Sequence, residues 1–484
     1  MLTATGTNSS QPVVEIKRLD PDVVNRTAAY PGLSNGTNVL VTIGGGVSEA
    51  TVSRLKLAGC TVTVLGAIGS VTAPPDCTIA EGSVLNPEAC AKAVKGQDAV
   101  VHAGRPPPGA GVVTSAALVE GTRNLLEAAT TAGVKAFVYG SSASVVFSGA
   151  DLIAVSEDMP FPSRFADPAS APIAEAEKAV LSANADSKAG GMLTCSVRAA
   201  SVYGGVRGGG EEEMADAEHL LLPGLASRAR AGTRPVGDGK NVVDFVYAGN
   251  VAHALLLAVQ ALLVLPTPTP AAAAAAAAAA VAGRAVFVTD MEPVPFGEFA
   301  GRALSRLGYP APGGGAGGGS GGIPVLLATA LAFLFQVVAF VVSPFFKFRP
   351  ALTALRVAEE STVRRFDTSR ATKDLGYTPL WSQEEALDIT LHAATALRNP
   401  GAKLKHIGPF TAAEVARHSS EDDAWIIVDG KVYDVTPYLG QHPGGDAMLR
   451  NAGGDSTEGM HGPQHPPQAM EILEQHFVGL LLEA

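Results

Sequence analysis

The chain has little cysteine for its length, with four cysteines among 484 residues. They stand at positions 60, 77, 90 and 195 and form no Cys-x-x-Cys pair. The sequence therefore predicts neither a disulfide framework nor a cysteine metal site, and it favours a reducing compartment. The N-terminus also lacks the basic-then-apolar order of a secretory signal peptide, so we expect synthesis in the cytosol.

Basic residues are also scarce. Lys and Arg number 35 against 46 Asp and Glu, which gives a net charge of -11. From Lys405 to the end, twelve acidic residues face four basic ones, a net charge of -8 on this part alone. This balance argues against a nucleic-acid partner and indicates a basic protein partner, such as a reductase with a cationic docking face.

The length predicts two or three structural units, and 47% hydrophobic residues are enough to fill their cores. Residues 1–36 are polar, and we expect a loose, disordered leader. Strand-like runs then alternate with helical ones up to about residue 260. The strands are expected at Val62–Leu65, Ala99–His102, Ala136–Tyr139 and Leu193–Val197, and the helices at Pro87–Lys95, Ser115–Ala132 and Ile173–Ala185. This alternation predicts an α/β fold, a Rossmann-like doubly wound parallel sheet, over residues 37–400.

The stretch from Asn38 to Ala58 reads as a buried strand, a glycine turn and a helix. Glycines let the backbone approach a pyrophosphate, and a helix N-terminus offers it free N–H groups. Gly44 and Gly46 are therefore candidate nucleotide-binding residues. A tight strand-to-helix turn with no ligand is the alternative at this point.

Three segments interrupt the pattern. Residues 266–282 are rich in Pro and Ala and residues 313–322 in Gly, which predicts an inserted loop and a flexible linker. Residues 323–346 carry no charge and are hydrophobic over about 20 residues, enough to cross a bilayer. A buried core helix is the alternative.

The C-terminal residues 408–484 resemble the cytochrome b5 family. The resemblance rests on Trp425–Leu439, Gln441-His442-Pro443-Gly444-Gly445, Ala452–Glu458, His465 and Phe477–Leu480. It implies a small α+β domain that binds haem b through His442 and His465 as axial ligands to the iron. Two imidazoles fill both axial positions, so such a haem carries electrons. His461, beside the second ligand, is an alternative ligand at this point.

The larger part of the chain resembles the extended short-chain dehydrogenases, in the group of 3β-hydroxysteroid dehydrogenases and decarboxylating sterol-4α-carboxylate 3-dehydrogenases. The motifs are Val119–Ala129, Val134–Ser144, Val197–Gly204, Gly237–Tyr247, Asn250–Ala254, Glu292–Phe296 and Asp374–Pro379. The resemblance implies NAD(P)-dependent oxidation of a sterol 3β-hydroxyl. The product is a β-keto acid that loses its 4α-carboxyl group in steroid biosynthesis.

The resemblance also shows which residues of the family's site are missing. Ser142 matches the hydroxyl that holds the substrate oxygen. The Tyr and Lys of the family's proton-transfer pair are replaced by Ala169 and Ile173, and Lys178 lies five residues too far along the helix. Without a phenol whose pKa a lysine lowers, the usual base is missing.

The cofactor side has changed as well. Ile43 and Glu49 replace two of the three turn glycines, and Gly66 replaces the acidic residue that would bind a ribose hydroxyl. A carboxylate at position 49 would repel a pyrophosphate. We therefore expect impaired hydride chemistry in this domain.

The hydrophobic segment lies inside the dehydrogenase resemblance, so the residues on both sides of it must reach one folded domain. This predicts a monotopic or re-entrant insertion in the endoplasmic reticulum membrane, with the dehydrogenase and haem modules facing the cytosol.

Two functions remain open from the sequence. The first is an enzyme of sterol biosynthesis whose haem module feeds electrons to a sterol methyl oxidase and receives them from an NADH-dependent reductase. The second is a membrane-bound electron carrier whose dehydrogenase-like domain is a catalytically impaired sterol-binding scaffold.

Overall fold

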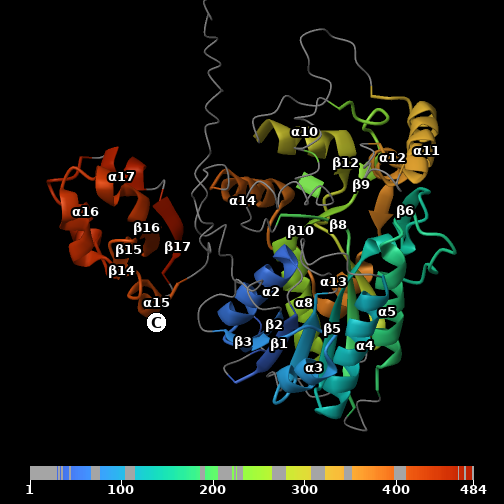
Figure 1. The fold of residues 1–484 in the computed structure, drawn as a ribbon, viewed down its shortest axis with the longest axis horizontal. Coiled ribbons are helices and arrows are strands. Elements are labelled where there is room, and N and C mark those ends of the chain that lie inside the picture. The colour runs from blue at the N-terminus through green and yellow to red at the C-terminus, as the bar shows by residue number, and fades with distance from the viewer. Residues whose placement is uncertain are drawn as a thin grey trace, which may run out of the picture. The chain divides into compact units, whose positions relative to one another are not determined.

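The computed structural model describes residues 30, 33, 36–42, 45–66, 77–103, 115–185, 191–204, 221–222, 225, 233–263, 280–306, 322–342, 352–396, 410–466, 468–473 and 476–481. They form two compact units, of which the larger ends at Thr395 and the smaller runs from Ala396 to Ala484 (Figure 1). The predicted inserts 266–282 and 313–322 lie almost entirely outside the described residues.

The larger unit is built on a parallel sheet of seven strands in the order β11-β7-β5-β4-β1-β2-β3. The strands are β1 (Asn38–Thr42), β2 (Thr61–Gly66), β3 (Thr78–Glu81), β4 (Ala99–His102), β5 (Ala136–Ser142), β7 (Leu193–Ala199) and β11 (Arg284–Val288). The predicted strands and the parallel, Rossmann-like arrangement are confirmed. The order reverses at β1, which lies between β2 and β4, as in doubly wound nucleotide-binding folds.

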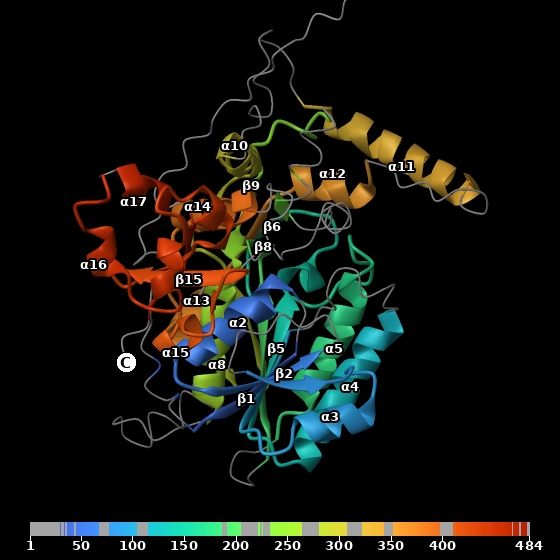
Figure 2. The same cartoon turned by 60° about the vertical axis from the view of Figure 1, so that its left-hand side comes forward.

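Helices cover both faces of this sheet (Figures 1 and 2). The helices of the larger unit are α2 (Gly46–Leu57), α3 (Pro87–Ala93), α4 (Ser115–Thr131), α5 (Ser170–Ser182), α8 (Ala248–Leu263), α10 (Phe296–Arg306), α11 (Val325–Val342), α12 (Ala354–Ser361), α13 (Ser369–Leu375) and α14 (Gln383–Ala396). Successive β1 residues face opposite sides because the side-chain period of a strand is two. Val39 and Val41 pack with Leu55 of α2, whereas Leu40 packs with Leu125 of α4.

Two residues of the expected leader belong to the core. Tyr30 is 6% exposed and Leu33 is 5% exposed. The Tyr30 hydroxyl accepts a hydrogen bond of 2.9 Å from Arg54 Nη2 and lies 2.7 Å from His253 Nδ1. Burial lowers the pKa of His253 to about 4, so its ring is neutral and can accept a hydrogen bond from the Tyr30 hydroxyl. The packed part of the chain therefore begins before Asn38.

Two smaller sheets lie beyond the end of β5 (Figure 1). One pairs β8 (Ser201–Tyr203) with β10 (Phe245–Tyr247), and the other has the order β12-β9-β13-β6. Its strands are β6 (Leu152–Val155), β9 (Val242–Val243), β12 (Val294–Pro295) and β13 (Arg364–Phe366). β13 follows the hydrophobic segment, yet it pairs with β6 and β9, which precede it. Both flanks of the segment thus belong to one unit.

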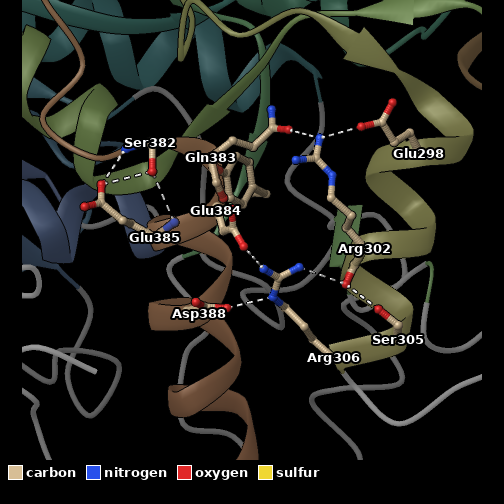
Figure 3. Close-up of polar contacts among 10 residues, drawn as sticks. Glu298, Arg302, Ser305, Arg306, Ser382, Gln383, Glu384, Glu385 and Asp388 are labelled. Atoms are coloured by element: carbon tan, nitrogen blue, oxygen red, sulfur yellow. Dashed lines mark hydrogen bonds and ion pairs between the residues drawn. The ribbon is translucent and has the colours of Figure 1, made fainter. Parts of the chain in front are cut away.

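Ion pairs between α10 and α14 join the same two flanks (Figure 3). Arg306 Nε lies 2.7 Å from Asp388 Oδ1, and Arg302 Nη2 donates to Gln383 Oε1 at 2.8 Å. Arg302 and Arg306 lie four residues apart, so one face of α10 presents both cations to α14.

Residues Val325–Val342 of the hydrophobic segment form α11, and only some of its described side chains are packed. Ala328 and Ala332 are buried with Val357 of α12. On the remaining surface, Leu326 is 89% exposed and Phe333 is 69% exposed. Among the helices within the described ranges, none is both long and apolar enough to cross a membrane.

The smaller unit holds a sheet of four strands in the order β14-β15-β16-β17, paired antiparallel. They are β14 (Ser419–Ser420), β15 (Asp423–Val428), β16 (Lys431–Asp434) and β17 (Phe477–Leu480), with the short helices α15 (Ala412–Val415), η4 (Thr436–Gln441), η5 (Gly445–Asn451), α16 (Thr457–Met460) and α17 (Gln468–Leu473). Asp429 and Gly430 have φ of 51° and 71°, the positive values that a two-residue hairpin turn requires. β15 and β16 therefore form a β-hairpin.

A buried ion pair ties α5 to β7 in the larger unit. Glu177 is fully buried, and its Oε1 lies 2.7 Å from Arg198 Nη2. Ser196 donates a second hydrogen bond to Glu177 Oε2 at 2.8 Å. Removing one partner of such a pair leaves the other charge buried without compensation.

We predict that Glu177→Gln lowers the free energy of unfolding by about 3 kcal/mol, because Arg198 then loses its counter-charge. Urea unfolding followed by far-UV circular dichroism measures the change. Glu175→Gln is the matched control, since Glu175 also lies on α5 but pairs with Arg123 at the surface. That control should change stability by less than about 1 kcal/mol. Equal effects of the two substitutions would contradict the prediction.

Candidate functional site

The carboxyl ends of β1 and β4 are held together by a buried histidine. His102 Nδ1 lies 2.8 Å from Thr42 Oγ1, and His102 Nε2 lies 3.0 Å from Thr122 Oγ1 of α4. Burial lowers the pKa of His102 to about 4, so the ring is neutral at pH 7. These contacts fix the edge of the sheet where doubly wound folds bind their ligands.

The glycine turn follows β1 at this edge. Gly45 precedes α2 with φ of 111°, a conformation that favours glycine, and Gly46 is the first residue of the helix. Ile43 and the candidate residue Gly44 lie outside the described residues. Glu49 lies in the first turn of α2. Its carboxylate therefore occupies the end of the helix that would otherwise attract an anion.

Ser142 ends β5 and begins a chain of three hydroxyl groups. Ser144 Oγ lies 2.9 Å from Ser142 Oγ, and Ser170 Oγ lies 2.9 Å from Ser144 Oγ. The Ser144 backbone N–H also donates to Ser142 Oγ at 3.2 Å. The family resemblance pointed only to Ser142, and the contacts of Ser144 and Ser170 with it appear only in the fold. Such hydroxyls can hold a substrate oxygen but supply no base.

The two positions where the family has its proton-transfer Tyr and Lys hold no side chain that could take over that role. Ala169 precedes α5, and Ile173 is 5% exposed and packs in the core beneath that helix. Lys178 directs its ammonium group to the ring of Phe161, with Nζ 4.8 Å from the ring centroid. The structure thus gives Lys178 a cation–π partner of its own.

In the smaller unit, His442 and His465 face one another. Their ring centroids lie 6.1 Å apart, with an angle of 37° between the ring planes. Two imidazole–metal bonds of about 2 Å each, plus the distance from each nitrogen to its ring centre, add to about 6 Å. The spacing therefore fits one metal ion between the two rings.

The surroundings of the two rings also fit haem. His465 Nδ1 donates to the Gly459 carbonyl oxygen at 3.0 Å, which leaves Nε2 with the lone pair that a metal needs. Apolar side chains pack in this part of the unit, among them Leu439, Met460 and Phe477. Within the ranges that the structure describes, no group of three or more His, Cys, Asp or Glu residues could hold a metal ion.

His461 is engaged elsewhere. Its Nε2 lies 2.8 Å from Asp429 Oδ2 in the hairpin turn, and its side chain is 55% exposed. An imidazole held at the surface by a carboxylate is not in place to compete with its neighbour His465.

Comparison with known proteins finds a matching family for each of the two units. The model of the 3-beta hydroxysteroid dehydrogenase/isomerase family matches residues 71–314, and that of the cytochrome b5-like Heme/Steroid binding domain matches residues 411–482. The chain is 32% identical over 321 residues to a mouse (Mus musculus) protein named sterol-4-alpha-carboxylate 3-dehydrogenase, decarboxylating, with 66% of this chain and 80% of the relative covered.

Plant relatives match a smaller share of their own length. Identity is 34% to the Arabidopsis thaliana protein named 3beta-hydroxysteroid-dehydrogenase/decarboxylase isoform 2, over 61% of this chain and 48% of the relative. Isoform 1 is 35% identical, over 58% of each chain. The chain thus spans about half the length of these two relatives.

Solved structures share the fold of the larger unit. A dTDP-glucose 4,6-dehydratase from Streptomyces venezuelae, crystallised with NAD and TYD, superposes with a TM-score of 0.51 at 20% identity. The match covers 76% of this chain and 100% of that one. From the sheet order, the motifs and these matches, the chain belongs to the 3-beta hydroxysteroid dehydrogenase/isomerase family.

Proposed function

We propose that the protein is a sterol-4α-carboxylate 3-dehydrogenase-like protein of sterol biosynthesis that carries electrons through a haem at its C-terminal end. The observation that carries this proposal is the facing pair His442 and His465, with ring centroids 6.1 Å apart. The names of its relatives and the family of its larger unit support the sterol pathway.

His442 and His465 would hold the iron of haem b, and Gly459 would orient the second ring through its carbonyl oxygen. A haem with two imidazole ligands supplies one-electron transfer. The acidic surface of this part of the chain suits a basic NADH-dependent reductase as donor, and a sterol methyl oxidase is a candidate acceptor.

In the larger unit we propose a sterol site at the carboxyl edge of the sheet. Ser142 would hold the oxygen at C3 of the sterol, supported by Ser144 and Ser170. If the unit takes NAD(P), Gly44 and Gly46 are its candidate contacts with the pyrophosphate. Glu49 opposes that role because its carboxylate stands at the same helix start.

A second candidate for this unit is a sterol-binding scaffold that has lost hydride transfer. Ala169 and Ile173 favour it, since neither side chain can exchange a proton and Ile173 is buried in the core. General acid–base groups contribute typically about 10²- to 10⁴-fold to a rate, so their loss would leave little turnover.

We also propose that α11 inserts into the cytosolic leaflet of the endoplasmic reticulum membrane without crossing it. Its exposed side chains include Leu326, Leu327, Phe333 and Leu334, each more than half exposed. An apolar helix surface of this kind is typical of helices that lie in the membrane interface.

Substitution of the two histidines tests haem ligation. We predict that His442→Ala and His465→Ala each abolish the absorbance spectrum of a six-coordinate haem in the purified full-length protein, because one axial ligand is lost. His461→Ala is the control and should keep that spectrum, since His461 pairs with Asp429. Loss of the spectrum in His461→Ala but not in His465→Ala would contradict the assignment.

Liposome flotation tests membrane insertion. Replacing Leu326 and Phe333 by Lys should lower the bound fraction of full-length protein several-fold, because each charge must enter the interface. Leu85→Lys is the matched control, since Leu85 is a 42% exposed leucine elsewhere in the larger unit. Unchanged flotation of the double variant would refute a role for α11.

A further inference from the structure

Arg364 lies at the same edge of the large sheet as Ser142. It begins β13, where it pairs with Leu152 of β6 and Val243 of β9. Its Nη1 donates to Ser201 Oγ at 3.2 Å, and its guanidinium carbon lies 5.8 Å from the centroid of the Phe147 ring. The family resemblance pointed to neither Arg364 nor these contacts.

Ser201 and Phe147, the two residues that Arg364 contacts, come shortly after the ends of β7 and β5, where the candidate site lies. Ser142 and Ala199 pair at the ends of β5 and β7, and Ser201 comes two residues after Ala199. Phe147 donates its backbone N–H to the carbonyl oxygen of Ser144, which in turn contacts Ser142. A short series of contacts thus joins the Arg364 guanidinium to the candidate substrate hydroxyl.

No carboxylate lies within ion-pair distance of Arg364 in the described part of the chain, although the nearby charge of Glu359 partly offsets the effect of burial on the pKa of Arg364. Three other arginines of the larger unit, Arg198, Arg356 and Arg370, each pair with a carboxylate within 3.1 Å. Arg364 instead donates to a hydroxyl and, at 2.9 Å, to the backbone carbonyl of Glu359.

The guanidinium group of Arg364 therefore has N–H donors without an acceptor in the described part of the chain. Two of its five N–H groups are used, and the buried Nε has no acceptor among the residues described. Burial lowers the pKa of Arg364, which reflects the cost of a desolvated cation. An anionic ligand would supply both an acceptor for these N–H groups and a counter-charge at closer range than Glu359.

We propose that Arg364 recognises the carboxylate of the substrate and thereby selects sterol acids over neutral sterols. Its Nη groups would donate charge-assisted hydrogen bonds to the C4 carboxylate while Ser142 holds the oxygen on the neighbouring carbon C3. This assignment rests on the proposed sterol function of the larger unit. Arg364 would act as a specificity residue, with no part in proton or hydride transfer.

The test compares two sterols that differ in one charge. 4α-Carboxycholestan-3β-ol and the neutral 4α-hydroxymethylcholestan-3β-ol are titrated into the haem-loaded full-length protein by calorimetry in matched detergent micelles. Arg364→Gln should weaken binding of the acid about 10- to 100-fold and change binding of the neutral sterol less than about 2-fold.

Two further variants control for charge and for folding. Arg365→Gln removes the neighbouring arginine, which is exposed on the opposite side of β13 and should leave both affinities unchanged. Arg364→Lys keeps the charge but loses the planar fork, so it should weaken binding of the acid by less than Arg364→Gln does. Arg364→Lys also keeps the role of Arg364 testable if Arg364→Gln fails to fold.

Every other result of the binding experiment contradicts either the role of Arg364 or the proposed sterol function. Equal weakening of both sterols, or unchanged binding of the acid, would overturn the role of Arg364 while leaving a sterol site in place. Equal affinity of the unsubstituted protein for the two sterols would do the same. Binding of neither sterol by the unsubstituted protein would overturn the proposed sterol function, and the assignment of Arg364 with it.

Discussion

Parallel strands all end at the same edge of a sheet, and the larger unit depends on that constraint. It places the last residues of β1, β4 and β5, which are Thr42, His102 and Ser142, at one edge although they lie up to one hundred residues apart in the chain. The neutral ring of His102 locks the first two strand ends to α4. The buried pair of Glu177 and Arg198 locks β7 to α5. The strand ends that would frame a ligand site are therefore in place, although Ala169 and Ile173 stand where the family has its proton-transfer Tyr and Lys.

In the smaller unit, turns and short helices position the two candidate haem ligands. His442 follows η4 and His465 lies in a turn after α16, so no strand or long helix carries either ring. Their facing arrangement depends on short helices packed around the hairpin of β15 and β16, and on the bond from His465 to Gly459. A haem held in this way, as proposed, would need neither the Tyr nor the Lys that Ala169 and Ile173 replace in the larger unit.

Periodicity predicted the parallel sheet and its helices, since alternating strands and helices of this length have few other ways to pack. The resemblance of the C-terminal motifs to the cytochrome b5 family pointed to both candidate haem ligands. Burial of Tyr30 and Leu33 could not be read from a polar segment, because two isolated apolar residues show no period. The unused hydrogen-bond donors of Arg364 were also hidden, because they depend on which segments meet around β13.

Turnover tests most directly the proposal that the larger unit keeps the dehydrogenase frame and has lost hydride transfer. The purified haem-loaded protein is given NAD or NADP and 4α-carboxycholestan-3β-ol, with the mouse relative as positive control, and nicotinamide reduction is followed by absorbance. We expect a rate at least about 10²-fold below the control, and a gain only when Ala169→Tyr and Ile173→Lys are combined. Turnover by the unsubstituted protein at a rate comparable to the mouse relative would contradict the account.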